Sequence, residues 1–141
     1  MKRIVIDANI LIRAILGIKV ASRIAQHAAT VQFLTTEIAF LEAQKHLPNV
    51  LSWRGAEIER IRLSLEDLER LKQSVIVIPT EIIAPFETQA RLRLLKRDQD
   101  DWHLLALCLG LQTPLWTEDN DFFGVGITTW KSALIDLFLN A

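Results

Sequence analysis

Short apolar runs rich in β-branched residues alternate along this sequence with longer segments of helical periodicity. The clearest short runs cover residues 2–6, 31–34 and 75–78. Alternation of this kind favours an α/β fold with a largely parallel sheet, because parallel strands need a long crossover between them, usually a helix. In such sheets ligands bind beyond the carboxyl ends of the strands, so the side chains that directly follow strands are the first candidates for a binding site.

The expected elements follow from periodicity and from turn residues. Thr35 or Thr36 can cap a helix that Pro48 would end, Pro79 and Pro85 would bracket a turn, and Gly110 would end another helix. Nothing resembles an internal repeat or a linker, so we expect one domain over residues 1–141. We predict strands at 2–6, 31–34, 75–78 and 115–116, helices at 10–16, 20–29, 35–46, 54–72, 86–95, 101–109 and 129–139, and a turn-rich stretch at 117–126.

Composition excludes several classes of protein. With 141 residues, 50% hydrophobic content and a formal net charge of −1, the chain does not have the composition of a disordered protein. Its one cysteine, Cys108, cannot form an intramolecular disulfide, and the N-terminus lacks the features of a secretory signal, so we expect a cytoplasmic protein. No stretch is long and apolar enough to predict a membrane span.

Carboxylates lie at the ends of several predicted elements. Each has a local explanation, because aspartates cap helices and form turns, and a glutamate within a helix is often only exposed. Asp7 is the hardest to explain in this way: it directly follows Ile4-Val5-Ile6, so a charge lies next to the core and needs a partner. The full set of these acids is Asp7, Glu42, Asp98, Asp100, Asp101, Asp119 and Asp121.

Four or more carboxylates repel one another unless a cation lies between them. Ligand sets made of oxygen atoms suit Mg²⁺ or Mn²⁺. Such a metal lowers the pKa of a bound water and neutralises charge on a phosphate, which is the chemistry of phosphodiester hydrolysis. The dispersed glycines form neither a dinucleotide fingerprint nor a P-loop, so no organic cofactor is expected.

The order of these motifs along the chain resembles the PIN-domain family, and is most similar to its VapC-like toxin components of toxin–antitoxin systems. The resemblance covers nearly the whole chain. It rests on Ile-Val-Ile-Asp7-Ala-Asn9, Thr36-Glu-Ile-Ala-Phe-Leu-Glu42, Arg97-Asp-Gln-Asp-Asp101-Trp-His-Leu-Leu-Ala and Thr117-Glu-Asp119-Asn-Asp121-Phe. It implies a PIN-like three-layer sandwich with a central, mostly parallel sheet flanked by helices.

The resemblance also implies roles for individual residues. Asp7, Glu42, Asp101 and Asp119 match the family's catalytic and metal-binding acids, with Asn9 and Thr117 in supporting positions. Two departures leave alternatives open, because Asp98 and Asp100 lie beside the third acid and Asp121 competes with Asp119. Glu37 is a weaker rival to Glu42, since an acid in the first turn of a helix is favoured by the helix dipole.

A metal-dependent endoribonuclease acting on single-stranded RNA is the function implied, with Mg²⁺ or Mn²⁺ as cofactor. A small antitoxin and a homodimeric assembly are the partners that the resemblance implies. A basic segment precedes the third acid and would attract the RNA backbone, although a like-charge block is often only a solvated helix face. Its candidate RNA-binding residues are Arg91, Arg93, Lys96 and Arg97.

Two alternatives keep the fold but change the function: a non-catalytic module that binds RNA or protein, and an RNA-processing nuclease outside any toxin system. A phosphatase or receiver domain fits poorly, because position 9 is Asn and no acid pair follows the first strand. The remaining chemically versatile residues are interpreted as structural, with His103 the one most able to reach a phosphate. They are His27, His46, His103, Cys108, Trp102 and Trp116.

Overall fold

A computed structural model describes all 141 residues and contains a five-stranded sheet in the order β3-β2-β1-β4-β5. Each neighbouring pair of strands is parallel, which confirms the predicted sheet. The first strand of the chain is therefore the central one, and the connections carry the chain to both sides of it. The strands are β1 (Lys2–Ile6), β2 (Val31–Thr36), β3 (Val75–Ile78), β4 (Leu115–Trp116) and β5 (Thr129–Trp130).

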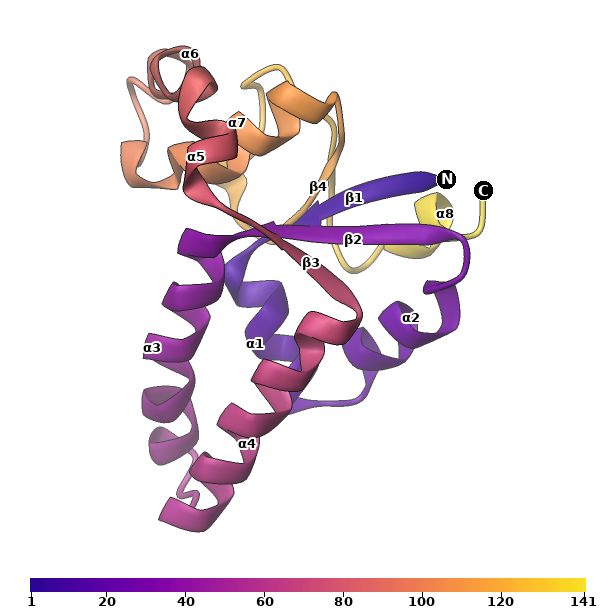
Figure 1. The fold of residues 1–141 in the computed structure, drawn as a ribbon, viewed down its shortest axis with the longest axis vertical. Helices are drawn as coiled ribbons and strands as arrows, with labels where there is room; N and C mark the ends of the chain where they lie inside the picture. Colours follow the sequence, from indigo (N-terminus) through magenta and orange to yellow (C-terminus); the bar gives the residue numbers. More distant parts are fainter.

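Helices cover both faces of this sheet, so the predicted α/β three-layer sandwich is confirmed (Figure 1). One layer holds α1 (Ala8–Leu16), α2 (Lys19–His27), α3 (Glu37–Trp53), α4 (Ile58–Arg70) and α8 (Ile135–Leu139). The other holds α5 (Thr80–Ile83), α6 (Glu87–Arg93) and α7 (Trp102–Leu111). Short 3₁₀ turns complete the chain: η1 (Leu71–Gln73), η2 (Ala84–Phe86), η3 (Gln99–Asp101) and η4 (Asn120–Phe122). None of the helices is long and apolar enough to cross a membrane.

Alternation along β1 divides the core into two clusters. Ile4 and Ile6 face the layer of α1 and α3, whereas Val5 faces the layer of α7. All three side chains are fully buried. This is the pattern expected of a parallel strand covered on both faces, where successive side chains point to opposite sides.

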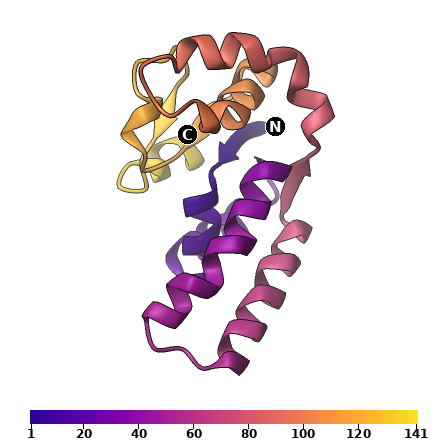
Figure 2. The same ribbon diagram turned by 90° about the vertical axis from the view of Figure 1, so that its left-hand side faces the viewer.

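The helix predicted at 35–46 is longer than expected, because α3 continues through Pro48 to Trp53. Proline lacks an N–H and removes one hydrogen bond from the helix interior. Leu47 and Leu51, on either side of it, are both buried in the core. Their packing outweighs the local penalty, and α3 and α4 together form a hairpin that projects from the sheet (Figure 2).

Gly110 does not end α7, as the sequence predicted; the helix reaches Leu111 and is closed by Gln112, which has a left-handed φ of 52°. The glycine has a packing role instead. A Cβ at position 110 would lie 2.9 Å from a ring atom of Phe86, so the absence of a side chain lets η2 approach α7.

Two further expectations were wrong. Pro79 and Pro85 do not bracket a turn, because each lies at the start of a short helix, where a missing N–H costs little. The helix predicted over 129–139 begins only at Ile135. Thr129 and Trp130 form β5 instead, since a β-branched and an aromatic residue fit the open edge beside β4.

The chain ends lie close together (Figure 1). Lys2, at the start of β1, donates its Nζ to the backbone carbonyl of Phe138 at 2.7 Å and to that of Ala141. The last helix is thereby fixed against the first residues of the central strand.

Candidate functional site

Asp7 lies at the carboxyl end of β1 and caps α1. Its Oδ1 accepts a hydrogen bond from the backbone N–H of Ile10 at 2.9 Å, and its Oδ2 accepts one from the hydroxyl of Thr117. The residue is only 6% exposed. Burial raises the pKa of Asp7 to about 6, even though both hydrogen bonds favour the ionised form, and the nearby Asp119 and Glu118 add to the rise.

One hydroxyl group connects two of the predicted acids. Thr117 directly follows β4 and is fully buried. Its Oγ1 donates to Asp7 and accepts the backbone N–H of Asp119 at 2.9 Å. Because β4 is the neighbour of β1, this bond spans 110 residues of sequence and fixes the two carboxylates at one edge of the sheet.

Asp101 and Glu42 reach the same place from two helices. Asp101 precedes α7, is half-buried, and has its pKa raised to about 7 by burial first and then by the charges of Asp98, Asp119, Glu42 and Asp121. Glu42 lies on α3 with its side chain 40% exposed. Carboxylates on separate elements therefore face one another closely enough to resist ionisation together.

These acids line one hollow of about 340 Å³ beyond the carboxyl ends of β1 and β4. The position agrees with the rule for ligands on parallel sheets. Asn9 also lines the hollow, whereas Thr117 lies beneath it as the buried link. Its walls comprise Asp7, Ala8, Asn9, Glu42, Asp101, Leu104, Glu118, Asp119 and Phe122.

Asp119 and Asp121 do not exclude each other. Carboxylate oxygens of Asp101, Asp119 and Asp121 all lie within 4.8 Å of one another. The backbone N–H of Asp121 also donates to Oδ1 of Asp119 at 2.9 Å, so the turn that holds one acid positions the other. Asp101, Asp119 and Asp121 thus form the tightest group of acids in the site.

The other competing acids lie elsewhere. Asp98 is exposed and caps η3 by accepting the backbone N–H of Asp100, itself an exposed residue. Neither lines the hollow, although the charge of Asp98 contributes to the raised pKa of Asp101. Glu37 accepts a hydrogen bond from Thr80 at 3.2 Å and is likewise absent from the hollow.

Glu118 also lines the acidic hollow, although its sequence context did not predict it as a site residue. Burial alone would raise its pKa, but hydrogen bonds from Ser132 and the nearby charges of Arg13 and Lys131 hold that pKa below its usual value. Oε1 accepts the Ser132 backbone N–H at 2.6 Å and lies 4.0 Å from the Arg13 guanidinium. Its position between Thr117 and Asp119 is the only signal that could have found it.

Three of the four candidate RNA-binding residues already have partners. Arg91 pairs with Glu87 at 2.8 Å and lies over the Trp102 ring. Arg93 donates to the carbonyl of Val125 at 2.9 Å, and Arg97 to those of Asp121, at 2.7 Å, and Phe123. Arg93 and Arg97 therefore hold the loop that carries Asp119 and Asp121.

Lys96 is the exception in this basic segment: it is exposed and makes no hydrogen bond or ion pair. Elsewhere, Trp102, Trp116, His103 and Cys108 are buried, as their structural interpretation predicts, while His27 is half-buried and His46 is exposed. Burial raises the pKa of the Cys108 thiol far above its usual range, so it is no nucleophile.

The donor set fits a hard divalent cation. All the groups that converge are carboxylate oxygens, with an amide from Asn9 and no sulfur or imidazole facing the hollow. A cation would also offset the burial of Asp7 and the mutual repulsion that raises the pKa of Asp101. Asp7, Glu42, Asp101 and Asp119, with Asp121 adjoining, are the residues that would hold it.

Solved structures with the same fold include three from different organisms. PAE2754 from Pyrobaculum aerophilum has a TM-score of 0.71 at 13% identity, over 99% of this chain and 97% of that one. VapBC2 from Rickettsia felis, bound to a DNA fragment from its promoter, has 0.69 at 12% identity, over 92% and 98%. VapBC-1 from nontypeable Haemophilus influenzae has 0.61 at 20% identity, over 92% and 97%.

No curated protein matches the sequence. A match to a sequence family does exist and spans nearly the whole chain. The family model described as PIN domain covers residues 5–140, from the middle of β1 to the end of the last helix. With the parallel sheet, the acids at its carboxyl edge and this match, the chain belongs to the PIN-domain family.

Proposed function

We propose that this protein is an endoribonuclease that uses Mg²⁺ or Mn²⁺ to cleave single-stranded RNA in the cytoplasm, as the toxin of a toxin–antitoxin pair. One observation carries the catalytic part of the proposal. Acids from four separate segments line one hollow, and two of them, Asp7 and Asp101, have pKa values raised first by burial and then by neighbouring acids. Keeping such a cluster is unfavourable without a cation, so its presence supports a metal centre.

The chain's own residues would divide the work. Asp7, Glu42, Asp101 and Asp119 would hold the cation, with Asp121 adjoining Asp101 and Asp119. A bound Mg²⁺ or Mn²⁺ supplies Lewis acidity toward a water and a phosphate. The hydroxyl of Thr117 holds Asp7 and Asp119 at fixed positions through its two hydrogen bonds. Asn9 adds an uncharged amide to the wall of the hollow.

The toxin assignment is supported by the similarity of the motifs to VapC-like toxins and by the shared fold with the VapBC structures. A small antitoxin would bind this chain and cover the acidic hollow, and two copies would form a homodimer. An RNA-processing nuclease would carry the same site without an antitoxin. Co-purification with the product of an adjacent small open reading frame, and relief of growth arrest by that product, tests the toxin role.

Cleavage of a labelled single-stranded RNA tests the catalytic role. We expect cutting with Mg²⁺ or Mn²⁺, none with EDTA, and none with folded Asp7→Asn or Asp101→Asn variants. Wild-type protein that binds RNA but leaves several RNAs intact under every metal would contradict the nuclease and favour a binding module. A duplex RNA of the same sequence serves as the control for strand preference.

A further inference from the structure

The helix α7 carries one polar side chain into an otherwise apolar interior. His103 is fully buried, and its neighbours in the helix, residues 102 and 104–108, are buried hydrophobic residues. An apolar aromatic residue would fill this position without burying a polar atom. The two ring nitrogens of His103 therefore need an explanation of their own.

Thr36 is the hydrogen-bond partner of one of the two ring nitrogens. This threonine caps α3, and its Oγ1 accepts the backbone N–H of Ala39 at 2.9 Å. The same Oγ1 lies 2.7 Å from Nδ1 of His103, and the threonine makes no other side-chain hydrogen bond. Because this hydroxyl already accepts the Ala39 N–H, its own proton is free for Nδ1, and in that arrangement the ring proton lies on Nε2.

That Nε2 has no hydrogen-bond partner although it is sealed from solvent. A buried N–H without an acceptor is costly and rare in native proteins. Oε1 of Glu42 lies 3.6 Å from this Nε2, and this is the one ion-pair contact of His103. Glu42 is a wall residue of the acidic hollow and is partly exposed, so its side chain can move the short distance that a hydrogen bond requires.

We propose that His103 is a positioning residue for Glu42: its Nε2–H binds one carboxylate oxygen and leaves the other facing the hollow. The chain of contacts runs from the cap of α3 through Thr36 and His103 back to Glu42 on the same helix. Its consequence for metal binding rests on the proposed function. Glu42 is the one wall acid contributed by a helix interior, and the imidazole of His103 is the only side chain within ion-pair distance of it.

The first test needs neither metal nor RNA. Ring-nitrogen NMR of the metal-free protein should show His103 as the Nε2–H tautomer. The Nε2–H proton should shift upfield in Glu42→Ala, because the acceptor is removed, and stay in place in Glu37→Ala, which removes an acid from the first turn of the same helix. An Nδ1–H tautomer, or an Nε2–H signal that ignores Glu42→Ala, would overturn the proposal.

The second test measures Mn²⁺ affinity and RNA cleavage. Outer groups that orient metal ligands typically contribute 10- to 100-fold, so His103→Leu should weaken Mn²⁺ binding by about tenfold or more. His103→Gln, whose amide can still donate toward Glu42, should restore most of that loss, and His46→Leu on the exposed side of α3 should change nothing. Equal affinities for wild type and a folded His103→Leu would refute the positioning role.

The two proposals fail in different ways. If wild-type protein bound no divalent metal, the proposed function would fail, while the tautomer and the response to Glu42→Ala would still decide the contact itself. If wild type bound Mn²⁺ and Glu42→Ala weakened binding but neither the His103 signal nor His103→Leu responded, the metal centre would stand and the role of His103 would fall.

Discussion

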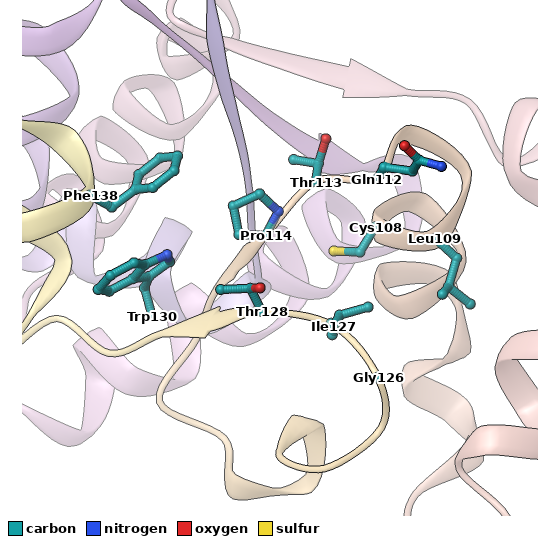
Figure 3. Close-up of a pocket in the computed structure, with 10 residues that line it drawn as sticks. All are labelled: Cys108, Leu109, Gln112, Thr113, Pro114, Gly126, Ile127, Thr128, Trp130 and Phe138. Carbon is teal, nitrogen blue, oxygen red and sulfur yellow. The ribbon is translucent and has the colours of Figure 1, made fainter. Parts of the chain in front are cut away.

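Two hollows lie at opposite ends of the short strands β4 and β5. The one beyond their amino ends is the larger, at about 440 Å³ against about 340 Å³, and is lined by Trp130, Phe138 and neighbouring side chains (Figure 3). Its only titratable residue is Cys108, whose pKa is raised far above its usual range. The smaller hollow has five acids in its wall.

The difference between the hollows shows that the chemistry of the lining, and not the volume, marks the candidate site. The amino-end hollow has no carboxylate or imidazole in its lining. The carboxyl-end hollow keeps Asp7 and Asp101 at pKa values of about 6 and 7, which costs stability unless a ligand compensates. If function belongs to the acidic hollow alone, substitutions in its wall should change activity and substitutions in the amino-end hollow should not.

The largest effect is expected from losing an acid. Since outer-shell groups already contribute 10- to 100-fold, Asp101→Asn should lower cleavage by at least about 100-fold. Phe138→Leu, in the amino-end hollow, should leave the rate unchanged. Initial rates on a labelled RNA at saturating Mn²⁺ measure both. Similar losses in the two variants would show that the comparison between the hollows is mistaken.

Removing the Thr117 hydroxyl should give the next largest effect. Thr117→Val leaves Oδ2 of Asp7 and the N–H of Asp119 without their partner, which should cost about 1–3 kcal/mol of stability. The same change should weaken Mn²⁺ binding by about tenfold. Thr117→Ser keeps the hydroxyl and should retain both properties. Chemical denaturation and metal titration of the two variants distinguish the hydroxyl from the methyl group.

The raised pKa values predict a pH dependence with a definite sign. Asp7 and Asp101 hold protons more tightly when folded, at about 6 and 7 instead of 3.8. Their contribution to the stability of the metal-free protein is full below about pH 4 and is lost as the pH rises through 6 and 7. Thermal midpoints of wild type should therefore fall over this range more than those of Asp7→Asn.

Metal binding should show the opposite trend, because the cation displaces these protons. Mn²⁺ affinity should fall by roughly tenfold over the first unit below pH 7 and level off above it. An affinity that is flat from pH 6 to pH 8 would contradict the assignment of Asp101 as a ligand. Asp98→Asn, which removes only a neighbouring charge, should move the titration to lower pH without abolishing binding.

The smallest effect concerns the basic segment. Lys96 has no partner, so Lys96→Ala should reduce the salt slope of RNA binding by about 0.7, the value for one phosphate of a single strand. Arg97 binds the loop of Asp121, so Arg97→Ala should also weaken Mn²⁺ binding. An unchanged salt slope in Lys96→Ala would exclude this residue from the RNA interface.

The shared sheet edge of Asp7 and Asp119 could be predicted from the sequence, whereas the length of α3 could not. Asp7 after a buried strand and Asp119 after another predicted a shared edge, because parallel strands end on the same side. The extension of α3 through Pro48 could not be predicted, since it depends on the burial of Leu47 and Leu51 against the core. Local residue preferences are overruled wherever packing supplies more free energy.

The contacts that hold the candidate acids in place could not be predicted from the sequence. Residue type and order suggested the acids, but not the partners that hold them. The basic segment predicts a surface for RNA, and the structure adds that Arg93 and Arg97 bind carbonyls of the 119–126 loop across more than 20 residues of sequence. The role of Thr36 beside His103 depends on a contact of 67 residues in sequence separation, which no local pattern reveals.

The hydrogen bond between Asp7 and Thr117 has a consequence for how the protein is made. Asp7 is synthesised 110 residues before Thr117, so β1 leaves the ribosome well before β4 does. Until then β1 lacks one of its two neighbours and the acidic hollow lacks a wall. A nascent chain therefore emerges without its acidic centre assembled, and that centre is completed only after β4 and Thr117 have been synthesised.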